Sequence, residues 1–123
     1  MMIDHCPTVL IVEDEPLVRM HGCDLLESAG FDVIEAQTAD EALDLLERHG
    51  HVRLLFSDVD MPGSMDGLEL ARRVHLRWPK IGLLMTSGHH RLTPEMIPDH
   101  GRFIAKPWRE NNVLAEMRAI LAS

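Results

Sequence analysis

Short apolar runs alternate along this chain with longer amphipathic stretches, and this alternation limits the fold more than any other feature. Uninterrupted apolar runs are typical of strands buried on both faces, and such strands are usually parallel. A helix between two parallel strands carries the chain back to the same end of the sheet in a right-handed crossover. The pattern therefore predicts an α/β fold, a doubly wound parallel sheet with helices on both faces.

Local signals set the expected bounds of each element. β-Branched runs predict strands, Thr38 with Glu41 is a capping-box pattern that predicts a helix start, and Gly30 and Pro79 predict helix ends. We expect strands at residues 8–12, 32–36, 54–57, 81–86 and 102–105, and helices at residues 16–29, 38–49, 66–78 and 109–121.

The stretch from Gly88 to Gly101 breaks this alternation. Pro94 and Pro98 lie where a fourth crossover helix would be, and proline interrupts helices. Only about one turn fits after Thr93, or one turn on each side of Pro98. We therefore expect a short or irregular fourth helix here.

Length and composition predict one acidic domain. The chain has 123 residues, 46% of them hydrophobic, which suits a single domain over 1–123 with its core in 8–121. Its formal net charge of -8 opposes direct binding to nucleic acid or to an anionic membrane surface.

Neither the cysteines nor the N-terminus indicates export. Cys6 and Cys23 are too few for a disulfide framework, so we interpret them as reduced thiols. The N-terminus lacks a signal-peptide pattern, and no apolar run approaches the roughly 20 residues of a membrane span. A cytoplasmic location is expected.

Carboxylates follow two of the predicted strands directly. Glu13 and Asp14 come after the first strand, and Asp58 follows the third. Because parallel strands end at one edge of the sheet, we expect these side chains to converge. Such close like charges repel unless a cation is shared. Hard oxygen ligands favour Mg²⁺, with Mn²⁺ as the alternative ion.

Two further strand ends add a hydroxyl and an ammonium group. Ser87 follows the fourth strand and Lys106 the fifth. A carboxylate nucleophile, a metal, a hydroxyl donor and a lysine are what phosphoryl transfer to an aspartate requires. Each residue alone fits an ordinary turn or surface position. Their order at successive strand ends is what indicates this chemistry.

Four segments together resemble the receiver domain of bacterial two-component response regulators, over nearly the whole chain. They are VLIVEDEP, LLFSDVDMPGSMDG, LLMTSGH and RFIAKPW. The resemblance implies the flavodoxin-like receiver fold, with five parallel strands in the order 2-1-3-4-5.

The resemblance implies a role for each matching acid. Asp58 would be the phosphoacceptor that attacks the phosphohistidine of a sensor histidine kinase or a histidine phosphotransfer protein. Asp14 would bind the metal directly and Glu13 would be its partner. Asp58 itself and the backbone carbonyl of Asp60 would complete the protein ligands.

The resemblance also implies a switch. Ser87 would be the hydroxyl that moves toward the phosphoryl oxygen, and Phe103 the aromatic ring whose rotamer follows it. Lys106 would bind the phosphoryl group, and its bond to Pro107 would be cis. His89 lies two residues beyond Ser87, where we expect it to reach the phosphoryl group or its attacking water.

Three departures from the family pattern lie near the site. The loop over residues 61–67 is one residue longer than usual, and Asp60 puts an acid where many relatives carry a neutral side chain. The stretch over 88–101 is shorter than usual and rich in proline. The other histidines are interpreted as solvated. Trp78 is expected to close the third helix against the core, and Trp108 to be partly exposed.

The sequence thus predicts a phosphate-accepting signalling domain that acts on a downstream protein, not a turnover enzyme. Phosphorylation and dephosphorylation of its own aspartate would be its only reactions. The starting methionine and the end just past the last helix suit a stand-alone receiver. A receiver fragment of a hybrid kinase or longer regulator, and a pseudo-receiver that is never phosphorylated, are the alternatives within the family.

A haloacid dehalogenase-like phosphatase is the alternative outside the family. Its nucleophile lies in a D-x-D pattern, which Asp58 and Asp60 fit. Its acidic pair follows the lysine, however, whereas Glu13 and Asp14 precede the nucleophile and no such pair follows Lys106. The order of the motifs therefore favours a receiver.

Overall fold

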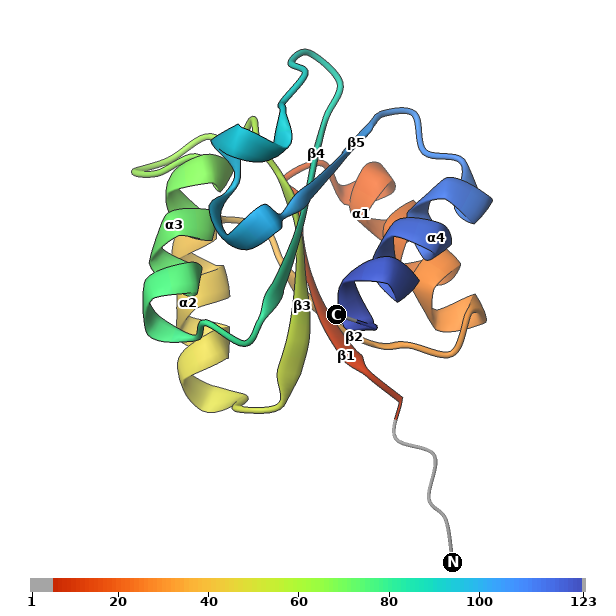
Figure 1. Ribbon diagram of the computed structural model, residues 1–123, viewed down its shortest axis with the longest axis horizontal. Helices are drawn as coiled ribbons and strands as arrows, with labels where there is room; N and C mark the ends of the chain where they lie inside the picture. Colours follow the sequence, from red (N-terminus) through yellow and green to blue (C-terminus); the bar gives the residue numbers. More distant parts are fainter. Residues whose placement is uncertain (1–5, 123) are drawn as a thin grey trace, which may run out of the picture.

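The computed structural model describes residues 6–122, which form a parallel sheet between two layers of helices (Figure 1). The ends of the expected domain, residues 1–5 and 123, lie outside the described residues. The strands are β1 (Thr8–Val12), β2 (Asp32–Ala36), β3 (Val52–Asp58), β4 (Gly82–Ser87) and β5 (Arg102–Ala105), and the helices are α1 (Pro16–Ser28), α2 (Ala39–Arg48), α3 (Gly67–Arg77) and α4 (Glu110–Leu121).

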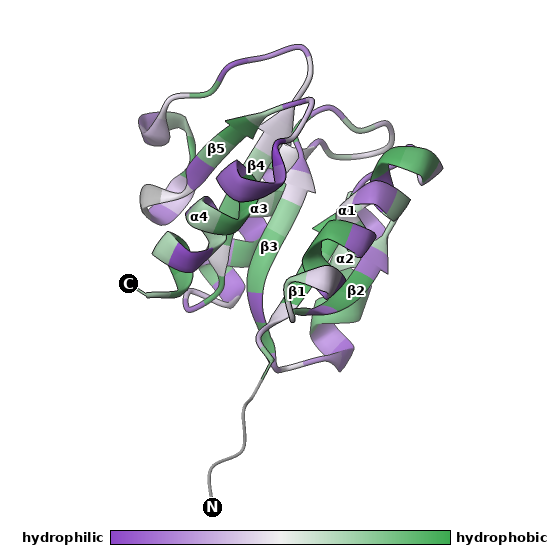
Figure 2. Ribbon diagram, turned by 90° about the vertical axis from the view of Figure 1, so that its right-hand side faces the viewer, coloured by the Kyte–Doolittle hydropathy of each residue, from purple (hydrophilic) through white to green (hydrophobic). Residues whose placement is uncertain are grey.

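Within residues 6–122, the sheet has five parallel strands in the order β2-β1-β3-β4-β5, which confirms the predicted 2-1-3-4-5 order. All five residues of β1 are buried, because helices cover both faces of this central strand. β3 is hydrophobic over most of its length (Figure 2). The uninterrupted apolar runs therefore correspond to central strands buried on both faces, as expected.

The helices divide into two layers. α2 and α3 cover one face of the sheet, and α1 and α4 cover the other (Figure 1). Successive side chains of a strand point to opposite faces. In β3, Leu55 packs in the core under α2 and α3, whereas Leu54 and Phe56 pack in the core under α1 and α4.

Caps and turns place the helices as the sequence predicts. Thr38 Oγ1 accepts a hydrogen bond from the Glu41 amide at 3.1 Å. The Glu41 carboxylate in turn accepts a hydrogen bond from the amide of Gln37, one residue before the cap. Asp66 caps α3 by accepting from the Glu69 amide at 2.9 Å. The expected bounds are thus correct to within two residues.

β3 begins two residues earlier than expected. Val52 pairs with Thr8 and Leu54 pairs with Val9, so the register shifts at the exposed Arg53. The sequence did not indicate the start of this strand, because the charged Arg53 interrupts its apolar run.

Two short 3₁₀ turns, Pro94–Met96 and Pro98–His100, replace a fourth crossover helix. This outcome confirms the expectation of an irregular segment. Ile97 lies between the turns and is buried in the core under α2 and α3. Gly101 follows them closely, and a Cβ atom there would lie 2.2 Å from Ile97 Cγ2. The segment is therefore attached to the core mainly through Ile97.

Both cysteines are free thiols, Cys6 exposed and Cys23 buried, and burial raises the pKa of Cys23 to about 12. Trp78 ends α3 and packs against the core, as predicted. Among residues 6–122, none of the helices combines the length and the apolar character needed to cross a membrane.

Candidate functional site

Three carboxylates converge where β1 and β3 end. The two strands are neighbours with Val12 opposite Ser57, so the residues that follow, Glu13 and Asp58, come to the same level. Glu13 is 1% exposed and Asp58 4%. One carboxylate oxygen from each of these residues and from the half-buried Asp14 lies within 4.8 Å of the others. The convergence predicted from the sequence is therefore confirmed.

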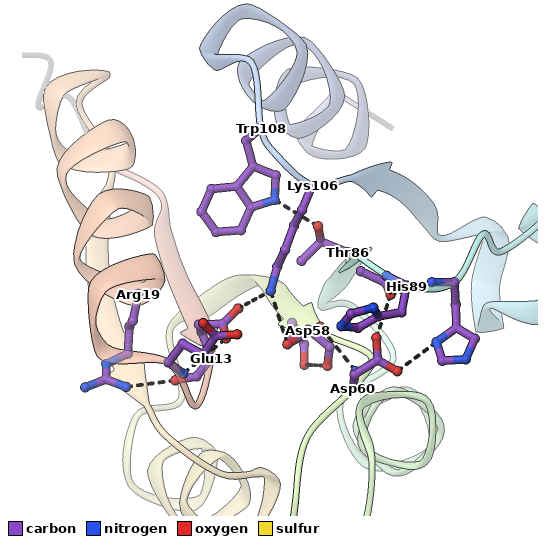
Figure 3. Close-up of polar contacts among 12 residues, drawn as sticks. Glu13, Arg19, Asp58, Asp60, Thr86, His89, Lys106 and Trp108 are labelled. Carbon is purple, nitrogen blue, oxygen red and sulfur yellow. Dashed lines mark hydrogen bonds and ion pairs between the residues drawn. The ribbon is translucent and has the colours of Figure 1, made fainter.

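Lys106 reaches these carboxylates from the end of β5. Its Nζ lies 2.7 Å from Glu13 Oε1 and 3.2 Å from Asp58 Oδ2, so one ammonium group bridges two buried acids (Figure 3). The side chain passes Gly88, where an added Cβ would lie 3.8 Å from Lys106 Cβ. The bond from Lys106 to Pro107 is cis, as the resemblance implied.

The electrostatics of the acidic site are dominated by burial. Burial raises the pKa of Asp58, although the charge and hydrogen bond of Lys106 oppose it. Burial likewise raises the pKa of Glu13 against the hydrogen bond from Lys106. For Lys106, burial would lower the pKa, but the two carboxylates outweigh it and raise the pKa. The pKa values of both acids are raised despite their ion pairs, because one ammonium group does not compensate for the loss of water around two carboxylates.

The donor set fits a magnesium ion. Its ligand atoms are carboxylate oxygens, the hard ligands that Mg²⁺ prefers. In an octahedron with bonds of about 2.1 Å, ligand oxygens lie roughly 3 to 4 Å apart. One carboxylate oxygen each from Glu13, Asp14 and Asp58 lies within 4.8 Å of the others, close to this spacing. The backbone carbonyl of Asp60 stays a predicted ligand.

The Ser87 hydroxyl makes no hydrogen bond to Asp58 in this structure. Its Oγ donates to Asp60 Oδ2 at 2.6 Å. The same Oγ accepts from the backbone amides of His89 at 3.0 Å and His90 at 2.9 Å. The sequence correctly brings Ser87 to this edge of the sheet, but its hydroxyl is held by Asp60 and by the turn after β4.

Asp60 lies between the acidic site and β4. Its amide donates to Asp58 Oδ1 at 3.2 Å, while its carboxylate turns toward Ser87, and its Oδ1 lies 2.8 Å from His90 Nδ1 (Figure 3). His89, the histidine singled out from the sequence, lines a cavity of about 170 Å³ beside Asp58 and Lys106. The contact of His90 with Asp60 was missed, because side-chain directions in a turn leave no periodic signal.

Thr86 precedes Ser87 and points to the opposite face of the sheet, as the alternation along a strand requires. The Thr86 hydroxyl accepts from Trp108 Nε1 at 2.8 Å (Figure 3). Trp108 is half-buried, packs against Phe56 with ring centroids 5.1 Å apart, and stacks on His21. Trp108 therefore anchors the segment that follows Lys106, a role its sequence position did not indicate.

Arg19 is a second residue that sequence reasoning missed. From α1 it donates to the backbone carbonyl of Glu13 at 2.8 Å (Figure 3), and it pairs with Glu35 of β2 at 3.1 Å. It thereby holds the turn after β1 in place. Phe103 is half-buried against the core under α2 and α3, and its predicted coupling to Ser87 stays a prediction.

The longer loop over residues 61–67 is attached to α2 and to the core. Ser64 donates to Asp40 of α2 at 2.8 Å, and Met65 is buried in the core. The loop ends at Gly67, where a Cβ atom would lie 2.0 Å from the Asp58 carbonyl oxygen. Only glycine fits against the backbone of β3 at this point, so Gly67 allows the end of the loop to pack directly on the backbone of Asp58.

Comparison with known proteins identifies this arrangement. Residues 9–118 match the family model of the response regulator receiver domain. The chain belongs to this family. Receiver domains are signalling domains of two-component response regulators and hybrid kinases, so the family membership excludes the haloacid dehalogenase alternative.

Its relatives include receivers within much longer proteins. The receiver is 45% identical over 83 residues to the sensor kinase CckA of Brucella abortus, covering 67% of this chain and 9% of that protein. It is 32% identical over 115 residues to the C4-dicarboxylate transport transcriptional regulatory protein DctD of Rhizobium meliloti, covering 91% of this chain and 25% of that protein. The chain thus spans a small part of these relatives.

Solved structures show the same fold. The signal receiver domain of an HD domain-containing protein from Pseudomonas fluorescens Pf-5 superimposes with a TM-score of 0.86 at 26% identity, covering 96% of each chain. A response regulator receiver protein from Sinorhizobium medicae WSM419 gives 0.88 at 21% identity, covering 97% of each. The described chain is therefore a receiver fold along almost its whole length.

Proposed function

We propose that this receiver accepts a phosphoryl group on Asp58 from a phosphohistidine of a sensor histidine kinase or a histidine phosphotransfer protein. The observation that carries the proposal is the position of Asp58, buried beside Glu13 and Asp14 with Lys106 Nζ 3.2 Å from its Oδ2. A buried carboxylate with this surrounding is an activated nucleophile in a site that opposes negative charge on a phosphoryl group.

The transfer needs no reactant other than the phosphohistidine and a proton from solvent. An Asp58 carboxylate oxygen attacks phosphorus, the phosphorus–nitrogen bond breaks, and its electron pair stays on the imidazole, which takes up a proton from solvent. An acyl phosphate forms on Asp58. Lys106 offsets charge on the equatorial oxygens, and the Asp60 amide, 3.2 Å from Asp58 Oδ1, orients the carboxylate.

Charge balance supports a divalent cation. When ionised, Glu13, Asp14 and Asp58 together carry three negative charges, and Lys106 supplies one positive charge. Two charges are left, which Mg²⁺, or Mn²⁺ in its place, would neutralise. When bound there, the ion would also offset the charge of the incoming phosphoryl group. Glu13, Asp14 and Asp58 are the side chains that would hold it, with the backbone carbonyl of Asp60.

Phosphorylation would change a protein-binding surface. A phosphoryl group adds about -1.5 to -2 charge, and Ser87, Lys106 and Phe103 are the residues proposed to respond to it. We propose a downstream protein as the target, because a net charge of -8 opposes direct contact with nucleic acid. We also propose the cytoplasm, where thiols stay reduced, and no catalytic turnover beyond loss of the phosphate from Asp58.

Intact-mass measurement after acetyl phosphate treatment tests the proposal. The wild type should gain one phosphate in Mg²⁺ or Mn²⁺ and none in EDTA, because the uncompensated carboxylates repel the donor. Asp58→Asn should gain none. Asp44→Asn, which changes an exposed aspartate on α2, should gain phosphate like the wild type. A wild type that stays unmodified with both cations, or an equal gain in Asp58→Asn, contradicts the proposal.

A further inference from the structure

The hydroxyl of Ser87 has no hydrogen-bonding capacity to spare. Its single hydrogen is donated to Asp60 Oδ2, and its oxygen accepts two backbone amides, those of His89 and His90. A serine hydroxyl has one donor and two acceptor positions. Every position is therefore occupied in the structure.

The bond to Asp60 is of the strong kind. Its O···O distance is 2.6 Å, within the range of charge-assisted bonds from a hydroxyl to a carboxylate. Ser87 is 1% exposed, so water does not compete for its hydrogen. A phosphoryl oxygen on Asp58 would need that same hydrogen, and one hydrogen does not serve both acceptors.

We propose that Asp60 is a competing acceptor that holds the Ser87 hydroxyl away from Asp58 until a phosphoryl group displaces it. We call the Ser87–Asp60 hydrogen bond the Asp60 latch. The inference rests on the proposed function and makes Asp60 a positioning residue. In some phosphorylated molecules the Ser87 hydroxyl bonds to the phosphoryl group, and in the others it stays with Asp60. The ratio depends on the relative strength of the two hydrogen bonds.

The backbone of Asp60 is held in place by a hydrogen bond to Asp58. The Asp60 amide is tied to Asp58 Oδ1, so the carboxylate is presented on the side of β4. The contact with His90 contributes less than the Ser87 bond, because the His90 side chain is 61% exposed and water screens such pairs. The buried Ser87 hydroxyl is therefore the partner that decides where the Asp60 carboxylate lies.

The latch also connects the phosphoryl site to the segment after β4. The oxygen that donates to Asp60 accepts the amides of His89 and His90, which form the first turn after Ser87. When the hydroxyl rotates toward Asp58, it leaves Asp60 and weakens these two bonds together. Release of the latch should therefore be visible as faster exchange of the two amides.

NMR of the unphosphorylated chain in EDTA tests the latch directly. In Asp60→Asn a neutral amide oxygen replaces the carboxylate, and a neutral hydrogen bond is weaker than a charged one. Exchange of the His89 and His90 amides should rise about five-fold, and the Ser87 χ1 population should shift. Asp60→Ala, with no acceptor, should show the larger change. Glu15→Gln removes a charge from the same cavity without touching Ser87, and should leave both signals unchanged.

The same variants treated with acetyl phosphate and Mg²⁺ separate the latch from the proposed function. If the latch exists, phosphorylation moves Ser87 χ1 in the wild type toward the population already raised in Asp60→Ala. A wild type that gains phosphate while Ser87 χ1 and both amides match in wild type, Asp60→Asn and Asp60→Ala overturns the latch alone. A wild type that gains no phosphate overturns the proposed function, and the latch as a switch with it.

Discussion

The acidic site and the connection between β4 and β5 lie side by side but are built differently. The acidic site, formed by Glu13, Asp14, Asp58 and Lys106, stands on the ends of strands, and Glu13 and Asp58 are almost fully buried. The connection, residues 88–101, consists of two 3₁₀ turns and mostly exposed residues. The sheet thus holds the chemical groups rigidly, while the segment that follows has few attachments.

This difference suits a signalling domain. A reactive carboxylate needs fixed neighbours, because catalytic charge stabilisation depends on groups that are already oriented. A responsive segment needs low local stability, which comes from exposed backbone and few apolar contacts. Ser87 belongs to both regions, since its hydroxyl contacts Asp60 on one side and the first turn of the connection on the other.

The largest expected effect concerns the counterion of the acidic site. Lys106→Met leaves Glu13 and Asp58 buried without an ammonium partner, and breaking a buried ion pair costs about 3–5 kcal/mol. Urea denaturation in EDTA should show this loss in the free energy of unfolding. Because a cation substitutes for the lost charge, added Mg²⁺ should restore more stability in the variant than it adds to the wild type.

Lys80→Met is the matched control for this prediction. Lys80 is the other lysine of the chain and is exposed, so its replacement should change the free energy of unfolding by less than about 0.5 kcal/mol. Equal effects of the two substitutions would show that Lys106 does not compensate the buried carboxylates.

A second effect should come from Ile97, the main apolar anchor of the connection. Ile97 is 4% exposed and packs in the core under α2 and α3. Ile97→Ala should lower the free energy of unfolding by about 2–4 kcal/mol, through lost burial and the cavity left behind. Met96→Ala, at a neighbour that is 52% exposed, should change it by less than about 0.5 kcal/mol. If both changes are small, the connection is not anchored at Ile97.

The smallest effect is a gain in stability. The pKa of Asp58 is raised in the folded state from its ordinary value of 3.8. The protonated carboxyl group is therefore favoured by folding, and the stability that this provides is lost as the pH rises from 3.8 through the raised pKa. At pH 7 without a cation, the neutral amide of Asp58→Asn should therefore stabilise the fold by about 1 kcal/mol. The gain should vanish below the ordinary carboxyl pKa, where both states are protonated.

Thermal unfolding in EDTA at several pH values measures this gain. Asp44→Asn, at an exposed position on α2, should show no such pH-dependent difference from the wild type. A loss of stability in Asp58→Asn at pH 7 would mean that the ion pair with Lys106 outweighs burial.

Much of this architecture follows from local sequence. The strands of continuous apolar residues, the Thr38 cap and the prolines at 94 and 98 act through neighbours in sequence, so their consequences were predicted correctly. The start of β3 was placed late because Arg53 interrupts its apolar run. A register shift depends on the partner strand, which local patterns do not contain.

The candidate site likewise has features that the sequence predicts and contacts that it does not. The convergence of Glu13, Asp14 and Asp58 follows from the order of strands, since parallel neighbours end at one edge. The bridge from Lys106 to both Glu13 and Asp58 and the bond from Trp108 to Thr86 join residues far apart in sequence. They were not predicted, because side-chain partners depend on packing across the sheet.

The fold class, the edge of the sheet where the chemistry lies and the residues gathered there could all be predicted from the order of residues along the chain. These depend on periodicity and on the order of strand ends, which are local or topological properties. The direction of the Ser87 hydroxyl and its bond to Asp60, by contrast, became visible only in the folded chain. A hydrogen bond requires a distance defined to a few tenths of an ångström and a suitable angle. Both partners reach that geometry only when the packed strands hold them in place.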